Sequence, residues 1–359
     1  MKRHVLRLCV LLLLVLIGTL SYLGLRGWRF LHEAPESNGR EVFFDVLPGA
    51  RLGTVAHQLF DAGLITDEKA FILLARFYQE HNKLKAGRFA LHTGWLPEAV
   101  LKTLVHGKPV LYRITLPEGL TLWQTAKLLE EQGFVKASAF LSVVTDPVFL
   151  RHCGIPLPSA EGFLMPDTYL LKKYEEVEET EAAADATTQQ SAERKQATRI
   201  GRRLVDNFWA RAENLWPDKT RPKDADLKRL VILASIVEKE TALESERARV
   251  AGVYTNRLAK NMLLQADPTV IYGLGPTFSG RLLYRHLDDR KNPYNTYQLP
   301  GLPPGPICSF GMSALKAAIS PESHQFFYFV ADSNGKGHVF SRTLEEHNKA
   351  VQKYRQSKK

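Results

Sequence analysis

The sequence predicts an α+β protein with an N-terminal transmembrane helix, small αβ modules and a mixed α/β domain built around a buried helix. Three observations support this class. A charge-free apolar run covers Leu8 to Leu25, one strand–turn–helix pattern occurs twice, and an almost wholly apolar helix begins near Leu227. The chain has 359 residues and is 45% hydrophobic, which is enough for two or three domains with their own cores.

The N-terminal apolar run is long enough to cross a bilayer. Its roughly 18 residues reach about 27 Å at about 1.5 Å each. Lys2, Arg3 and Arg7 precede it, so we expect a cytoplasmic N-terminus. A cleaved signal peptide is the alternative, but no small-residue cleavage motif follows Leu25. We therefore expect a single-pass protein of the cell inner (cytoplasmic) membrane, with the rest of the chain periplasmic.

The charge and the cysteines limit the class of partner. The net charge is +10, which suits anionic surfaces and acidic polymers. Without zinc-finger spacing, an aromatic RNA-binding motif or a long Lys/Arg run, we expect no nucleic-acid partner. Cys153 and Cys308 could pair in an oxidising compartment or remain two separate buried thiols, because spacing alone does not show proximity.

A strand–turn–helix pattern occurs at 46–65 and again at 115–135. Each copy has a strand, a Pro/Gly turn, an amphipathic helix and a glycine at the helix end. The strands are expected at 41–47 and 111–116, and each helix has one apolar face that needs a covering partner. The matching residues share one constant offset: Gly49, Ala56, Leu59 and Gly63 correspond to Gly119, Ala126, Leu129 and Gly133.

The first copy, with a further strand "AGRFAL" at 86–91, resembles a LysM-type module. Modules of this family are small sugar-binding units of cell-wall proteins. The alternative is an αβ spacer that binds nothing. After the second copy, residues 174–200 are rich in Glu, Ala, Thr and Gln, which is typical of a solvated helix or a flexible insertion.

A buried helix is predicted from about Leu227 to Leu243, with Asp224 or Asp226 as its N-cap. Its apolar residues cover nearly the whole circumference, so it lies in a domain centre. The stretch "ASIVEKET" brings Glu238 and Glu240 to its C-terminal end. Partial burial raises a carboxyl pKa and keeps the group protonated near neutral pH, as a general acid requires. The helical wheel does not choose between the two glutamates.

The region after this helix is rich in aromatic and amide side chains. "LLQADPTVIYG" places Asp267 before a proline, as an expected N-cap, and "NPYNTYQLPGLPPGPI" precedes a predicted buried strand at 326–332 and a strand and helix at 337–351. Turn chemistry is one explanation; a sugar-binding groove is the other. Acyl-enzyme, metalloprotease, nucleotide-binding and metal-ligand motifs are missing from the sequence, so we expect no metal and no cofactor.

These motifs together resemble the YceG-like endolytic murein transglycosylase family (MltG), from about Phe43 to the C-terminal helix. The resemblance implies a lytic transglycosylase that cleaves the MurNAc–GlcNAc β-1,4 bond of peptidoglycan and leaves 1,6-anhydroMurNAc ends, and it maps the catalytic acid to Glu240. Peptidoglycan polymerases are an implied partner. Glu238 and Glu161 are secondary candidates, the latter as the second carboxylate of an ordinary hydrolase. A non-catalytic peptidoglycan-binding scaffold is the alternative function. The expected substrate-binding residues are Gln265, Asp267, Thr269, Tyr272, Tyr294, Asn295 and Tyr297.

The expected organisation follows from these segments. It comprises a cytoplasmic tail at 1–7, a transmembrane anchor at 8–28, a LysM-like module at 41–110, a second repeat unit with its linker at 111–172, a polar insertion at 173–200 and a catalytic domain at 201–359.

Overall fold

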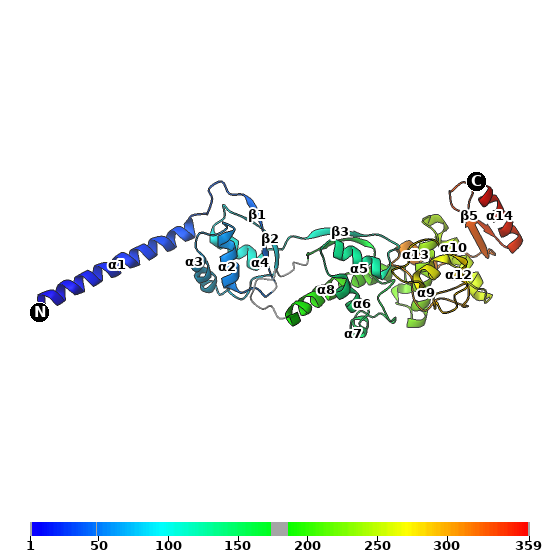
Figure 1. Ribbon diagram of the computed structural model, residues 1–359, viewed down its shortest axis with the longest axis horizontal. Helices are drawn as coiled ribbons and strands as arrows, with labels where there is room; N and C mark the ends of the chain where they lie inside the picture. Colours follow the sequence, from blue (N-terminus) through cyan, green and yellow to red (C-terminus); the bar gives the residue numbers. More distant parts are fainter. Residues whose placement is uncertain (1, 48, 174–185, 358–359) are drawn as a thin grey trace. The chain divides into compact units, whose positions relative to one another are not determined.

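The computed structural model describes residues 2–47, 49–173 and 186–357 and has a mixed α+β architecture, with many helices and small two-stranded sheets. Figure 1 shows the order of its elements along the chain. The chain divides into two compact units at Tyr112/Arg113. Of the polar insertion predicted at 173–200, residues 174–185 lie outside the described residues, and residues 186–200 belong to helix α8 (Ala186–Ala212).

The N-terminal helix α1 (Lys2–His32) corrects the prediction of a membrane anchor. None of the helices, in the residues that the structure describes, is both long and apolar enough to cross a membrane. The predictions of a transmembrane helix and of an inner-membrane location were therefore wrong.

The first unit contains a helix pair between two paired strands. Strand β1 (Glu41–Val46) pairs antiparallel with β2 (Gly87–His92), with Phe44 opposite Phe89. Helices α2 (Leu52–Asp61) and α3 (Glu68–Phe77) connect the strands, and α4 (Pro97–His106) follows. The apolar faces of these elements form one core, into which Phe30 from the end of α1 also packs.

Both copies of the repeated pattern fold in the same way. In the second unit, strand β3 (Tyr112–Leu116) leads to helix α5 (Leu122–Glu131). Gly63 after α2 and Gly133 after α5 have φ values of +67° and +73°, which favour glycine. The next residue, Leu64 or Phe134, donates its N–H to the carbonyl of the residue five positions earlier, the arrangement of a Schellman motif.

In the second unit, helices α6 (Ala137–Val144), α7 (Pro147–His152) and α8 accompany the strand pair that contains β3. β3 pairs with β4 (Asp167–Leu171), and α6 and α7 lie between α5 and β4 in the chain. Helix α8 packs against α6, because Ile200, Leu204 and Phe208 on one of its faces are buried.

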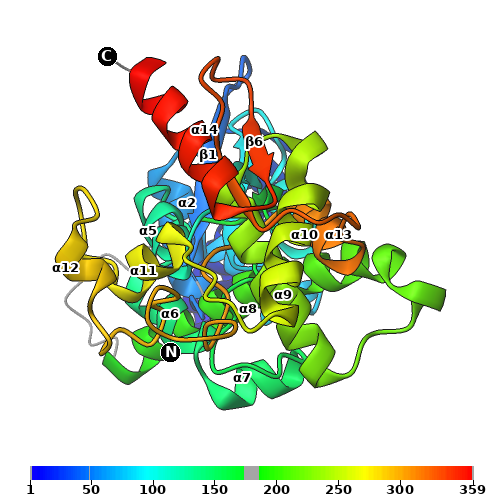
Figure 2. The same ribbon diagram turned by 90° about the vertical axis from the view of Figure 1, so that its right-hand side faces the viewer.

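The centre of the second unit is helix α9 (Asp224–Glu240), in which the eight consecutive residues from Leu230 to Val237 are all buried. It packs against α10 (Glu244–Ala259) and α13 (Met312–Ile319), as Figure 2 shows. The expected buried helix is therefore present. Its N-cap is Lys223 rather than an aspartate, and it ends at Glu240 because Thr241 is extended (φ −143°, ψ 130°).

The last elements surround the C-terminal end of α9. The 326–332 segment forms β5 (Tyr328–Ala331), which is only partly buried because it pairs with a single strand, β6 (His338–Ser341). The expected strand and final helix at 337–351 are confirmed as β6 and α14. The remaining helices are α11 (Asp267–Gly273), α12 (Tyr284–Leu287) and α14 (Leu344–Ser357).

Candidate active site

The C-terminal end of α9 places its two glutamates in different surroundings. Apolar residues on all sides hold the body of the helix in the core. Side chains two positions apart point about 200° apart around a helix. Glu238 and Glu240 therefore contact different elements, although both leave the same last turn.

Glu238 belongs to an internal ion-pair cluster with Arg247 and Glu118. Its Oε1 accepts from Nη2 of Arg247 at 3.0 Å, and its Oε2 accepts from the backbone N–H of Gly311 at 3.0 Å. Glu118 also pairs with Arg247, at 3.4 Å. Burial raises the pKa of Glu238, and the Gly311 amide and the Arg247 charge oppose that rise. This carboxyl binds α9 to α10 and to the segment before α13.

Glu240 has fewer partners and faces a cleft. Its Oε1 accepts from the Tyr254 hydroxyl at 2.8 Å, and Tyr254 lies on α10, which packs along α9. Burial raises the pKa of Glu240 to about 7, and the Asp267 charge adds to the rise, whereas the Tyr254 hydrogen bond and the Arg257 charge lower it. A carboxyl with this pKa can donate a proton near neutral pH and take it back afterwards.

The cleft at Glu240 has a volume of about 440 Å³. Asp267 lies at its wall and accepts a 2.5 Å hydrogen bond from the Tyr297 hydroxyl. Arg257 is held by the carbonyls of Leu264 and Phe327. Rings, a carboxylate and amides thus surround one protonatable carboxyl. The lining residues are Glu240, Tyr254, Arg257, Leu264, Gln265, Asp267, Tyr297, Tyr328, Phe329, Leu344, His347 and Asn348.

Glu161 lies in a separate buried cluster. Its side chain is 1% exposed, and its Oε2 accepts from the Leu122 N–H at 2.8 Å and from the Tyr272 hydroxyl at 3.1 Å. Burial raises its pKa to about 7, against the effect of these two hydrogen bonds. Its Oε1 is buried without a partner among the described residues, which suits the protonated form. Glu161 is not part of the cleft lining at Glu240.

The structure divides the seven expected substrate-binding residues into three groups. Gln265, Asp267 and Tyr297 line the cleft. Tyr272 and Tyr294 lie at Glu161, with their rings 4.8 Å apart. The other two are buried and hold the backbone: Thr269 bonds to Ala266 O, and Asn295 donates to the carbonyls of His286, Leu287 and Asp289.

Asp267 is not the helix N-cap that the sequence predicted. The N-cap of α11 is Ala266, and Asp267 is the first helical residue. Its carboxylate is therefore not used as a cap and is available to Tyr297. Pro268 is consequently the second helical residue and not the first, as the sequence had predicted, and it still fits the first turn.

The sequence interpretation missed several residues of the cleft, above all Tyr254 and Arg257. Arg247, Tyr254 and Arg257 are polar residues spaced seven and three positions apart, and thus lie on one face of α10. All three are at most 8% exposed. Polar residues at core spacing on an amphipathic helix were the signal that could have identified them. Tyr328, Phe329 and His347 carried no comparable signal, because they come from distant elements.

The fold and the cleft define an α+β protein with one protonatable carboxyl at the end of a buried helix. The chain belongs to the YceG-like family, whose model matches residues 44–353. A Bacillus subtilis (strain 168) protein named endolytic murein transglycosylase is 30% identical over 93% of this chain and 90% of its own length. A protein of the same name from Streptococcus pneumoniae (strain ATCC BAA-255 / R6) is 28% identical over 97% of this chain and 65% of its own length.

A solved structure supports the same assignment. The crystal structure of a YceG-like protein from Listeria monocytogenes matches 87% of this chain and 99% of that chain, with a TM-score of 0.52 and 29% identity. The likeness therefore covers both units of the chain.

Proposed function

We propose that this protein is an endolytic lytic transglycosylase of peptidoglycan, with Glu240 as its acid and base. The observation that carries the proposal is the placement of Glu240: a partly buried carboxyl with a pKa of about 7, bonded to Tyr254 and facing a cleft. The names of the relatives in Bacillus subtilis and Streptococcus pneumoniae support the substrate and the reaction.

The reaction needs one carboxyl because the substrate supplies the nucleophile. Glu240 donates its proton to the oxygen of the β-1,4 bond between MurNAc and GlcNAc, and that C–O bond breaks. The C6 hydroxyl of the same MurNAc residue attacks its C1, and the Glu240 carboxylate accepts the hydroxyl proton. The product ends in 1,6-anhydroMurNAc, and the enzyme recovers its proton. An intramolecular nucleophile also gains from proximity.

The other cleft groups support this cycle. The Tyr254 hydroxyl stabilises the carboxylate that remains after proton donation, and the Asp267 charge favours the protonated form beforehand. The positive charge of Arg257 lowers the pKa of Glu240 and so also favours that carboxylate. Cleavage within strands would terminate glycan elongation.

Product analysis tests the function. The whole chain is incubated with purified glycan strands, and mass spectrometry identifies the new ends. Anhydromuramyl ends support the proposal. Reducing ends would indicate hydrolysis, for which Asp267, which lies in the same cleft, is a better second carboxylate than Glu161. No new ends would favour the non-catalytic scaffold. Glu240→Gln should abolish the anhydro product and leave the circular dichroism spectrum unchanged.

We also propose that the 41–110 region is a LysM-like module that binds the substrate. The strand–helix–helix–strand order of β1, α2, α3 and β2 supports this. A partnership with peptidoglycan polymerases is a further proposal, which co-purification of the tagged chain with a polymerase would test.

A further inference from the structure

The turn before α2 and the turn before α5 present the same backbone groups. Gly49 and Gly119 have φ values of +81° and +80°. Arg51 and Thr121, the N-caps of the two helices, have φ values of −76° and −75° with extended ψ. The two turns therefore place equivalent N–H and C=O groups at equivalent positions.

In the second copy, a peptide segment and a carboxylate occupy this turn. Gly119 donates its N–H to the Ser309 carbonyl at 2.7 Å, and Ser309 donates its N–H to the Leu120 carbonyl at 2.7 Å. The first helical N–H, that of Leu122, donates to the Glu161 carboxyl at 2.8 Å. The turn thus binds an extended backbone and an acidic side chain together.

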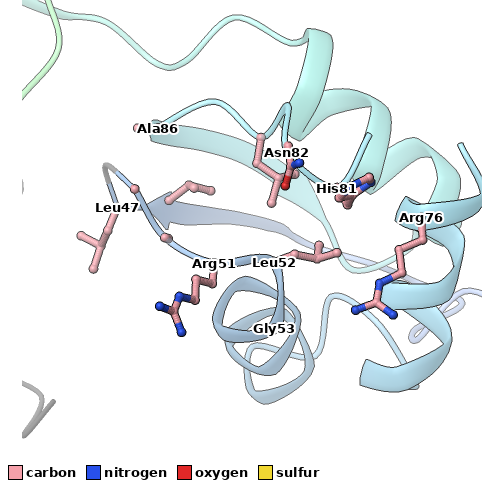
Figure 3. Close-up of a pocket in the computed structure, with 12 residues that line it drawn as sticks. Leu47, Arg51, Leu52, Gly53, Arg76, His81, Asn82 and Ala86 are labelled. Carbon is pink, nitrogen blue, oxygen red and sulfur yellow. The ribbon is translucent and has the colours of Figure 1, made fainter. Parts of the chain in front are cut away.

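In the first copy, the same groups lie at a cavity of about 520 Å³. Gly49 N, Ala50 O and Leu52 N have no hydrogen-bond partner in the part of the chain that the structure describes. Figure 3 shows the cavity between the turn, the last turn of α3 with Arg76, and the segment after α3 with His81 and Asn82.

The side chains around this cavity favour an acidic peptide over a bare sugar. Arg51 and Arg76 line it, and neither has an ion-pair partner among the described residues. Arginine forms paired hydrogen bonds with carboxylates. The described lining contains no acidic residue, and its only ring is the His81 imidazole, with no Phe, Tyr or Trp on which a pyranose usually stacks.

We propose that this cavity binds the carboxylate-bearing peptide branches of peptidoglycan, with the peptide backbone on Gly49 and Ala50, one carboxylate at Leu52 N and Arg51, and a second carboxylate at Arg76. The inference rests on the proposed function, because it takes its ligand from the same polymer. It assigns recognition of the peptide to the first unit, whereas the Glu240 cleft acts on the glycan.

Calorimetric titration of the full chain with a synthetic peptide branch, free at its carboxylates, tests the proposal. Arg51→Ala and Arg76→Ala should each weaken binding about ten- to hundredfold. Arg40→Ala, an exposed arginine outside the cavity, should leave affinity unchanged. Amidation of the peptide carboxyls should abolish binding.

Three results would overturn the proposal. The first is that both arginine variants still bind the peptide with unchanged affinity. The second is that the chain binds an N-acetylglucosamine oligomer but not the peptide. The third is an equal affinity for an unrelated acidic peptide of the same length, which would indicate a protein segment as the ligand. Binding is measured without turnover, so Glu240→Gln should keep it. If the chain binds the peptide but forms no anhydro products, only the proposed function is contradicted. If it forms anhydro products but does not bind the peptide, only this inference is contradicted.

Discussion

The hydroxyl of Tyr254 lies 2.8 Å from Oε1 of Glu240 and donates a hydrogen bond to it across the packed pair α9 and α10. The bond stabilises the ionised carboxyl and thus opposes the rise in pKa that burial causes. The proton affinity of the proposed acid is therefore set jointly by two helices, and the first two predictions alter it in opposite directions.

Tyr254→Phe should move the alkaline limb of activity to higher pH. Without the hydroxyl, the carboxylate loses a donor and the pKa of Glu240 rises above about 7. A hydrogen bond to a charged group corresponds to a shift of about one pH unit. Rates of anhydro-end formation between pH 5 and 9 check this. Tyr284→Phe, at a tyrosine that is 85% exposed, is the control, and an unmoved limb in Tyr254→Phe would contradict the role.

Asp267→Asn should move the same limb to lower pH. The Asp267 charge raises the pKa of Glu240, so its removal favours ionisation and the acid form is lost earlier as pH rises. Asparagine can still accept the Tyr297 hydrogen bond, which keeps the wall of the cleft in place. A limb that moves upward, or complete loss of activity at every pH, would show that Asp267 has another role.

Glu161→Gln should stabilise the protein at pH 8 more than at pH 5. The pKa of Glu161 is raised from 4.5 to about 7 in the folded state. The unfolded chain therefore releases this proton first, and folding stability falls as pH rises between these values, by up to about 3 kcal/mol. Glutamine stays neutral throughout. Denaturant titrations from pH 5 to 8 measure the difference, with the exposed Glu213→Gln as the control; a pH-independent difference would contradict the buried proton.

Arg247→Met should destabilise the fold by about 3 to 5 kcal/mol, because it leaves the buried Glu238 charge without its partner. The double variant Arg247→Met/Glu238→Gln should recover much of that loss. Denaturant unfolding of the four proteins in this cycle gives the coupling energy. Glu238→Gln alone should keep the anhydro product, and its loss would show that Glu238, and not Glu240 alone, takes part in the chemistry.

The sequence could predict elements whose signals are local. The repeated helices α2 and α5 each have one apolar face and a glycine at the left-handed position after the helix, so both were found. The buried helix α9 was recognisable from apolar residues on all its sides. The apolar N-terminal run was interpreted as an anchor from its length, whereas none of the helices in the described residues is both long and apolar enough to cross a membrane.

The site was less predictable, because its contacts join distant segments. Helical geometry alone could not separate Glu238 from Glu240. The structure separates them, since Arg247 and Gly311 surround the first and Tyr254 and Asp267 the second. The spacing of Thr269 and Asn295 near other polar residues suggested a groove, yet their side chains satisfy the backbone of neighbouring turns.

The abrupt end of α9 at Glu240 has a consequence for how this family can vary in length. Insertion or deletion of one residue within Val231–Val237 would rotate everything after it by about 100° and move both glutamates out of their present surroundings. The loops after α10 can absorb such changes without this effect. We therefore expect functional relatives to vary in length freely in those loops, and to keep the residue count of this helix segment fixed.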